Sequence, residues 1–208
     1  MIYPTESKTF YSHLQLNVPR FDLVKPIYEK QFLINPLYPP PHWTKIWASS
    51  IALSQYLMTH PTVVNNKTIL EVGAGIGLPS FSIAHLAKNI ILTDYAIDAI
   101  ELMQENIKQL ELENTTAQLL DWHTLDHNIE CDVLLLSDIN YDPTQFEALA
   151  TFINSYLDRS STVIIATPNR IISSPFIQKF ATFIKELHKE YIVENNNEVE
   201  IGIFTLRH

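Results

Sequence analysis

Glycine is scarce in this chain, with only four residues among 208. Three of them, Gly73, Gly75 and Gly77, alternate within the stretch ILEVGAGIGLPS at residues 69–80. Glycine costs conformational entropy, so a chain this poor in it does not use it as loop filler. The cluster therefore indicates a place where the backbone turns tightly or approaches a ligand closely.

Cysteine and basic side chains are also few. The single cysteine, Cys131, excludes an internal disulfide. Lys and Arg total 14 against 23 Asp and Glu, and the net charge of −9 argues against broad contact with nucleic-acid phosphates. No apolar run reaches the ~18 residues of a membrane-spanning helix, and the first residues do not resemble a signal peptide. We expect a cytoplasmic protein without nucleic-acid or membrane partners.

Proline content divides the chain into two parts. Residues 1–42 hold seven of the twelve prolines and few periodic stretches. This composition predicts an irregular extension that packs on the site or acts as its lid. Residues 43–208 are long enough for one sizeable core, and we expect them to form the main domain.

After residue 43, short β-branched runs alternate with helical patterns. Strands are predicted at 67–72, 89–94, 116–122, 131–138 and 162–168, with an antiparallel pair at 191–195 and 198–206. Helices are predicted at 43–60, 77–88, 96–112, 143–158 and 174–189. This alternation predicts an α/β fold, in which helices cover both faces of a mostly parallel sheet.

The glycine cluster follows the first of these strands, at the sheet edge where such folds bind ligands. Its spacing, G-x-G-x-G, differs from the dinucleotide fingerprint G-x-G-x-x-G and lacks the Lys that a phosphate loop requires. Glu71 places a carboxylate before the loop, which favours a ligand with positive charge. A nucleoside cofactor is the favoured interpretation, and a tight turn without a ligand is the alternative.

Acidic residues Glu71, Asp94 and Asp121 lie at three consecutive predicted strands. Asp94 is placed to accept from both hydroxyls of a ribose. Asp121 and the adjacent Trp122 offer an acceptor and an apolar wall to an adenine. The alternative role for Asp94 and Asp121 is that of a helix cap or a solvated turn.

Histidine gives little indication of a metal, and no metal site is expected. Only His123 and His127, among eight histidines, have a spacing that suits a shared ligand. Asp126 lies between them in an apparent loop, which favours a polar surface turn.

Together these motifs resemble a known family. E-x-G-x-G-x-G with the downstream Asp94 and Asp138 resembles the seven-strand, class I S-adenosylmethionine-dependent methyltransferases. Trp43-x-x-x-Trp47, LLLSDINYDP and VIIATPNR are similar to the branch of small protein-lysine methyltransferases. Within it, the chain resembles enzymes acting on the electron-transfer flavoprotein β-subunit and their nicotinamide N-methyltransferase-like relatives. The resemblance spans about residues 42–206 and implies a Rossmann-like three-layer sandwich with an antiparallel C-terminal strand in a seven-stranded sheet.

The resemblance also implies a site. Asp138 and Tyr141 would face the methyl group and the acceptor as catalytic residues. Asp142 is the expected cap of the next helix, which leaves Asp138 free for that role. The residues that would hold S-adenosylmethionine, or its product S-adenosylhomocysteine, are Trp47, Glu71, Gly73, Ala74, Gly75, Gly77, Asp94, Asp121, Trp122 and Ser137.

We therefore expect an N-methyltransferase that modifies a lysine of a protein substrate. One alternative acceptor is a small amine or a pyridine such as nicotinamide, which needs no deprotonation. The other alternative is a non-catalytic domain that binds the cofactor as a sensor or interaction module, because fold alone does not establish activity.

Overall fold

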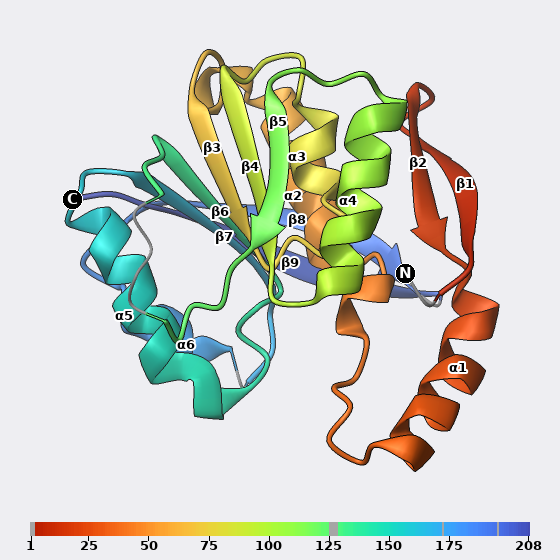
Figure 1. Cartoon of the computed structure of the whole chain (residues 1–208). Coiled ribbons are helices and arrows are strands. Elements are labelled where there is room, and N and C mark those ends of the chain that lie inside the picture. Colours follow the sequence, from red (N-terminus) through yellow and green to blue (C-terminus); the bar gives the residue numbers. More distant parts are fainter. Residues whose placement is uncertain (1–2, 125–128, 172, 195) are drawn as a thin grey trace.

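A seven-stranded sheet forms the centre of the computed structural model, which describes residues 3–124, 129–171, 173–194 and 196–208 (Figure 1). The strand order is β5-β4-β3-β6-β7-β9-β8. The strands are β3 (Thr68–Val72), β4 (Asn89–Asp94), β5 (Thr115–Leu119), β6 (Val133–Ser137), β7 (Thr162–Pro168), β8 (Ile184–Glu194) and β9 (Asn197–Leu206). Only β9 runs against its neighbours, so the predicted mostly parallel sheet with an antiparallel C-terminal strand is confirmed.

Helices cover both faces of this sheet (Figure 1). One layer consists of α2 (Ala48–Thr59), α3 (Leu78–Ser82) and α4 (Ile97–Gln109), and the other of α5 (Phe146–Leu157) and α6 (Ser174–Gln178). Short 3-10 turns are η1 (His42–Thr44), η2 (Pro61–Val63) and η3 (Pro143–Gln145). Within the described ranges, no helix combines the length and apolar character needed to cross a membrane.

Strand β6, at the centre of the sheet, is apolar on both faces. Leu135 packs into the core beside α2, α3 and α4, whereas Leu134 and Leu136 pack beside α5. Successive strand side chains point to opposite faces, and both faces are covered here, so no polar alternation develops. All three leucines are fully buried, which stabilises the fold by about 1.5–3 kcal/mol for each side chain.

The N-terminal segment differs from the irregular extension that the sequence predicted. Strands β1 (Thr5–Phe10) and β2 (Leu14–Pro19) form an antiparallel hairpin, and α1 (Phe21–Ile34) follows. The hairpin turns through Tyr11 and Ser12, which both have positive φ. Turn rules assign such positions to Gly, Asn or Asp, so this turn carries no recognisable signal in the sequence.

A buried amide attaches the hairpin to α4. Asn106 has no exposed surface, and its Oδ1 accepts from the Asn17 N–H at 2.7 Å. Its Nδ2 donates to the Asn17 carbonyl at 3.0 Å. One side chain thus satisfies both backbone groups of Asn17, which pair with no strand on that side among the described residues.

Two predicted helices also end differently. The sequence predicted a helix over 174–189, but α6 ends at Gln178 and β8 begins at Ile184. Residues 184–189 favour a helix locally, yet their ladder with β9 overrides that preference. The predicted 43–60 helix begins only at Ala48, and α3 spans 78–82 of the predicted 77–88.

Replacing the buried amide tests the attachment of the hairpin. Asn106→Ala is expected to lower the free energy of unfolding by about 2 kcal/mol, because both backbone groups of Asn17 lose their partner. Hydrogen exchange of the β2 amides should accelerate as well. The matched control is Gln109→Ala, which removes a more exposed bond to the Gln15 carbonyl and should cost less than about 0.5 kcal/mol. Equal effects of the two variants in denaturant unfolding would contradict this interpretation.

Candidate active site

A cavity opens at the carboxyl ends of β3, β4 and β6. Its walls come from five segments: the glycine loop after β3, the ends of β4 and β6, the segment that follows β5, and the turn that precedes α2. Its lining includes His42, Trp43, Lys45, Trp47, Gly73, Ala74, Gly75, Gly77, Asp94, Tyr95, Trp122, Ser137, Asp138 and Tyr141. Ten of the twelve predicted site residues therefore share one cavity, and the two exceptions are Glu71 and Asp121.

The glycine loop owes its composition to the close approach of other parts of the chain. Gly73, Gly75 and Gly77 all have positive φ, between 56° and 78°. A Cβ on Gly75 would lie 3.2 Å from the Trp43 carbonyl oxygen, and one on Gly73 would lie 2.9 Å from Ile139. A side chain is therefore excluded at these glycine positions, which present bare backbone to the cavity.

Glu71 lies behind the loop, not on the cavity wall. Its side chain is buried, and its Oε2 accepts from the Ser80 N–H at 3.1 Å and from the Ser80 Oγ at 2.5 Å. Glu71 thereby fixes the first turn of α3 against β3. Burial raises its pKa to about 7, against the hydrogen bonds from Ser80 that favour the ionised form.

Asp94 lies at the cavity and also binds two backbone N–H groups. It lines the cavity, and its buried carboxylate accepts from the Gly75 N–H and the Ala96 N–H, both at 2.9 Å. These bonds hold the glycine loop and the start of α4. Burial raises the pKa of Asp94, and the backbone donors oppose that shift. Each carboxylate oxygen accepts more than one hydrogen bond, so acceptor capacity for a ribose hydroxyl is left.

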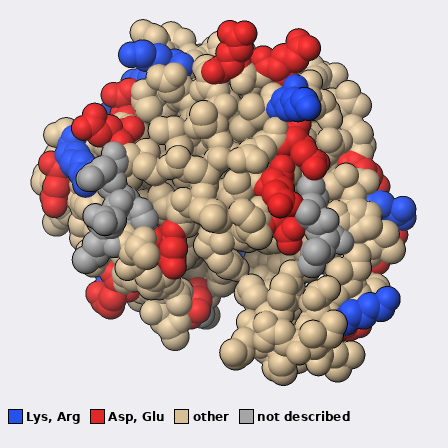
Figure 2. All heavy atoms as spheres, in the orientation of Figure 1, with Lys and Arg blue, Asp and Glu red and all other residues tan. Residues whose placement is uncertain are grey.

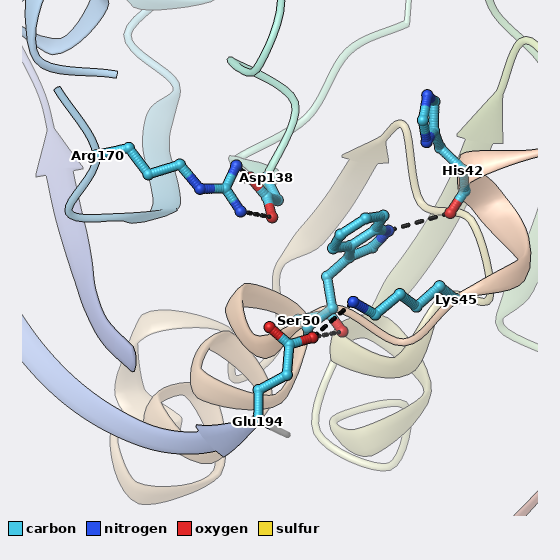
Figure 3. A network of polar contacts seen from close by, with 7 residues as sticks. His42, Lys45, Ser50, Asp138, Arg170 and Glu194 are labelled. Atoms are coloured by element: carbon cyan, nitrogen blue, oxygen red, sulfur yellow. Dashed lines mark hydrogen bonds and ion pairs between the residues drawn. The ribbon is translucent and has the colours of Figure 1, made fainter. Parts of the chain in front are cut away.

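Asp138 ends β6 in a left-handed conformation, with φ of 52°. Its carboxylate is almost fully buried, and Arg170 donates to both oxygens, at 3.1 Å and 3.3 Å (Figure 3). Burial raises the pKa of Asp138, and the charge of Arg170 lowers it. Of the seven described non-glycine residues with positive φ, Asp138 is the one that lines the cavity.

Arg170 is a site residue that the sequence prediction missed. It follows β7, the neighbour of β6, so the topology brings it to the same sheet edge as Asp138. The signal that could have identified it is a cation directly after a strand end, in the motif VIIATPNR.

Aromatic side chains surround the rest of the cavity, and Tyr95 was also missed. Tyr95 directly follows Asp94, and it lines the cavity together with Trp122 and Tyr141. The Trp122 Nε1 is buried and has no hydrogen-bond partner among the described residues, so it can donate to a ligand. Trp47 is the residue before α2, not part of its apolar face, and its Nε1 donates to the His42 carbonyl at 3.0 Å.

Asp121 lies outside this cavity. Its Oδ1 accepts from the His123 N–H at 3.0 Å and lies 2.7 Å from the His123 Nδ1. It lines an adjacent hollow together with Tyr95, Trp122 and Tyr141. This placement resembles the solvated turn that was the alternative for Asp121.

Metal ligation has no support in the described ranges, where no three His, Cys, Asp or Glu side chains lie close enough to share an ion. Asp126 and His127 of the predicted surface turn lie outside the described residues. What the cavity offers is acidic acceptors, aromatic walls and bare backbone. This set fits a nucleoside that carries a positive charge.

Comparisons with known proteins point in the same direction. A family model described as "Lysine methyltransferase" matches residues 43–190. The protein N-terminal and lysine N-methyltransferase EFM7 of Cryptococcus neoformans is 26% identical over 190 residues, covering 83% of this chain and 64% of the relative. The human histone-arginine methyltransferase METTL23 is 26% identical over 124 residues, covering 57% of this chain and 65% of the relative. The chain thus spans less than two thirds of these relatives.

Solved structures show the same fold. The N-methyltransferase NodS of Bradyrhizobium japonicum, in complex with S-adenosyl-L-homocysteine, has a TM-score of 0.63 at 12% identity, covering 86% of this chain and 98% of NodS. A putative RNA methyltransferase of Pyrococcus horikoshii has a TM-score of 0.62 at 15% identity, covering 82% of this chain and 91% of that protein. At such identities the likeness shows the fold alone.

The raised pKa of Glu71 predicts a specific pH dependence of stability. Between pH 4.5 and about 7 the folded protein keeps a proton that an unfolded Glu has lost, so the contribution of Glu71 to stability falls as pH rises. The full change is on the order of 3 kcal/mol. Glu71→Gln removes this titration, so its Tm relative to the native protein should rise from pH 5 to pH 8, by about 5 °C or more.

Thermal unfolding at the two pH values checks this, with Glu147→Gln as the control because that carboxylate is exposed. The control should show the same Tm difference at both pH values. A Glu71→Gln difference that is also independent of pH would contradict a neutral Glu71 in the folded protein at pH 5.

Proposed function

This chain belongs to the lysine methyltransferase family, and from that premise we propose that it is an S-adenosylmethionine-dependent N-methyltransferase that acts on a lysine of a protein. One observation carries the proposal beyond family membership. A buried carboxylate, Asp138, lies on the wall of the same cavity as the glycine loop and already holds a cationic side chain. A site for a nucleoside cofactor and a site for a cation therefore adjoin.

The residues of the cavity fit the cofactor. Asp94 would accept from the ribose, and Tyr95 and Trp122 would contact the adenine, with the free Nε1 of Trp122 as a donor. The backbone of the glycine loop would lie against the methionyl part. When bound, S-adenosylmethionine supplies a methyl carbon on a sulfonium, which is open to in-line attack and leaves S-adenosylhomocysteine as the product. Glu71 would act from behind the loop by holding α3 in place.

Asp138 and Tyr141 would bind and orient the acceptor. A lysine ammonium with a pKa of about 10.4 must lose a proton before it attacks, which costs about 4–5 kcal/mol at pH 7. Asp138 positions the amine but favours its charged form, so the cost is offset by burial and not by this carboxylate. Tyr141 is 43% exposed and its pKa is raised mainly by burial, so it keeps its proton and can donate a hydrogen bond beside a path to solvent.

The buried charge of Asp138 and the names of the related proteins both favour a protein lysine over the alternative acceptors. A neutral pyridine makes no use of a buried carboxylate, and the names of the relatives specify protein substrates. For a nucleic-acid acceptor the support is poor, since Lys and Arg side chains lie scattered over the face in Figure 2 and the net charge is −9. A non-catalytic sensor would not require a buried carboxylate beside the cofactor site.

Replacing the charge at Asp138 separates catalysis from cofactor binding. Asp138→Asn keeps the size of the side chain but removes the charge that binds the acceptor, so methyl transfer should fall at least about 100-fold. Affinity for S-adenosylhomocysteine should stay within about tenfold, a difference of 1.4 kcal/mol. Transfer is measured with radiolabelled S-adenosylmethionine on cell-lysate proteins, followed by mass spectrometry of the labelled product, and affinity by calorimetry.

Asp142→Asn is the matched control, because Asp142 is an exposed carboxylate that caps η3 through the Thr144 N–H, a bond that Asn also makes. This variant should behave as the native protein does. Undiminished transfer by Asp138→Asn would overturn the cationic acceptor and favour a pyridine. A native protein that binds NAD but not S-adenosylhomocysteine would overturn the cofactor assignment.

A further inference from the structure

Both oxygens of Asp138 already accept a hydrogen bond from a cation. The guanidinium of Arg170 donates to Oδ1 at 3.1 Å and to Oδ2 at 3.3 Å, and only 6% of the Asp138 side chain is exposed. A second cation on the same buried carboxylate would leave a net positive charge with little solvent to screen it. The acceptor ammonium and Arg170 therefore compete for Asp138.

The neighbouring charges do not relieve this competition. Lys45 and Glu194 form the other ion pair in Figure 3, with the Lys45 Nζ 2.7 Å from the Glu194 Oε1. The Lys45 Nζ also lies 4.1 Å from the centre of the Trp47 ring. The charges of Lys45 and Glu194 neutralise each other, so the Glu194 carboxylate does not compensate the charge of a second cation at Asp138.

Arg170 separates two cavities. Asp138 lines the cavity with the glycine loop, whereas Arg170 lines a second cavity between α6 and the β8–β9 pair. The second cavity offers apolar contacts for an alkyl chain at Ile177 and Phe204. In-line methyl transfer requires donor and acceptor to approach the carbon from opposite sides. The Asp138–Arg170 ion pair connects the two cavities, so an acceptor that enters through the second cavity would reach Asp138 from the side of Arg170.

We propose that Arg170 occupies, in the free protein, the position of the acceptor ammonium, and that the target lysine reaches Asp138 from the second cavity by displacing Arg170. This inference rests on the proposed function and deepens it. The exchange is neutral in charge, because one cation replaces another on the same carboxylate. The displaced side chain is 41% exposed, so its guanidinium regains water when it leaves. A neutral acceptor cannot replace it, which makes the Asp138–Arg170 pair selective for a cationic side chain.

The competition predicts that removing Arg170 strengthens amine binding. The probe is n-butylammonium, which reproduces the end of a lysine side chain, titrated by NMR on the amides around Asp138 with saturating S-adenosylhomocysteine. Arg170→Gln should bind n-butylammonium about three- to tenfold more tightly than the native protein, because no fraction of the site is closed by the guanidinium. Neutral n-butanol should show no such gain.

Three further variants make the test decisive. Lys179→Gln is the matched control, since it removes the cation of the Lys179–Glu147 pair, neither member of which lines either cavity, and it should bind the probe as the native protein does. Arg170→Lys keeps a competing cation with a single contact and should fall between native and Arg170→Gln. Ala181→Phe, at an exposed position on the second cavity, should weaken probe binding in the Arg170→Gln background.

Each outcome bears on a different claim. Unchanged or weaker n-butylammonium binding by Arg170→Gln, with normal S-adenosylhomocysteine affinity, would show that Arg170 anchors Asp138 and would overturn the displacement. Unaltered binding by Ala181→Phe would overturn the route through the second cavity. Failure of the native protein to bind S-adenosylhomocysteine would instead refute the proposed function, so the two failures are distinguishable.

Discussion

The site depends on one buried carboxylate that joins three chain segments. Asp94 at the end of β4 holds the Gly75 N–H of the neighbouring loop and the Ala96 N–H at the start of α4. The Ala74 N–H donates to the Thr93 carbonyl at 2.9 Å, which continues the contact between the loop and β4. Without these bonds the loop would have no fixed distance to the sheet edge, and the cavity would lose one wall. Charge-assisted bonds from backbone donors are strong enough to hold a carboxylate in place despite the cost of its burial.

Features of the fold could be predicted from the sequence when they depend on residues that lie close together along the chain. Strands, most helices and the glycine loop are encoded by residues close in sequence, so period and spacing identify them. The parallel direction of the strands follows from their alternation with helices, whereas their order in the sheet was not predicted. The hairpin before α1 depends on Asn106, which lies 89 positions from its partner Asn17, and no local pattern reveals that contact. Residues 184–189 become a strand only because β9 pairs with them.

The site residues also differ in whether the sequence could predict them. Side chains that line the cavity from strand ends, such as Asp94 and Asp138, were identifiable because topology brings strand ends together. Partners of those side chains were not, since the contact between Asp138 and Arg170 spans 32 positions and depends on side-chain direction. Glu71 belongs to the glycine motif and was predicted to contact the cofactor. In the structure it supports the loop from behind and does not line the cavity. A motif thus locates a site more reliably than it assigns contacts within it.

The left-handed backbone at Asp138 limits how this position can change during evolution. Of the residues with a side chain, Asn and Asp adopt a positive φ most readily, because a short polar side chain compensates locally. Glu also keeps the charge and can adopt such a φ, as Glu111 does at 53°, but it would extend the carboxylate by one methylene. Asn and Gly suit the backbone as well as Asp does, yet both remove the charge. Aspartate is therefore the residue that combines this backbone with a short acid, and a single substitution to Asn loses the acid.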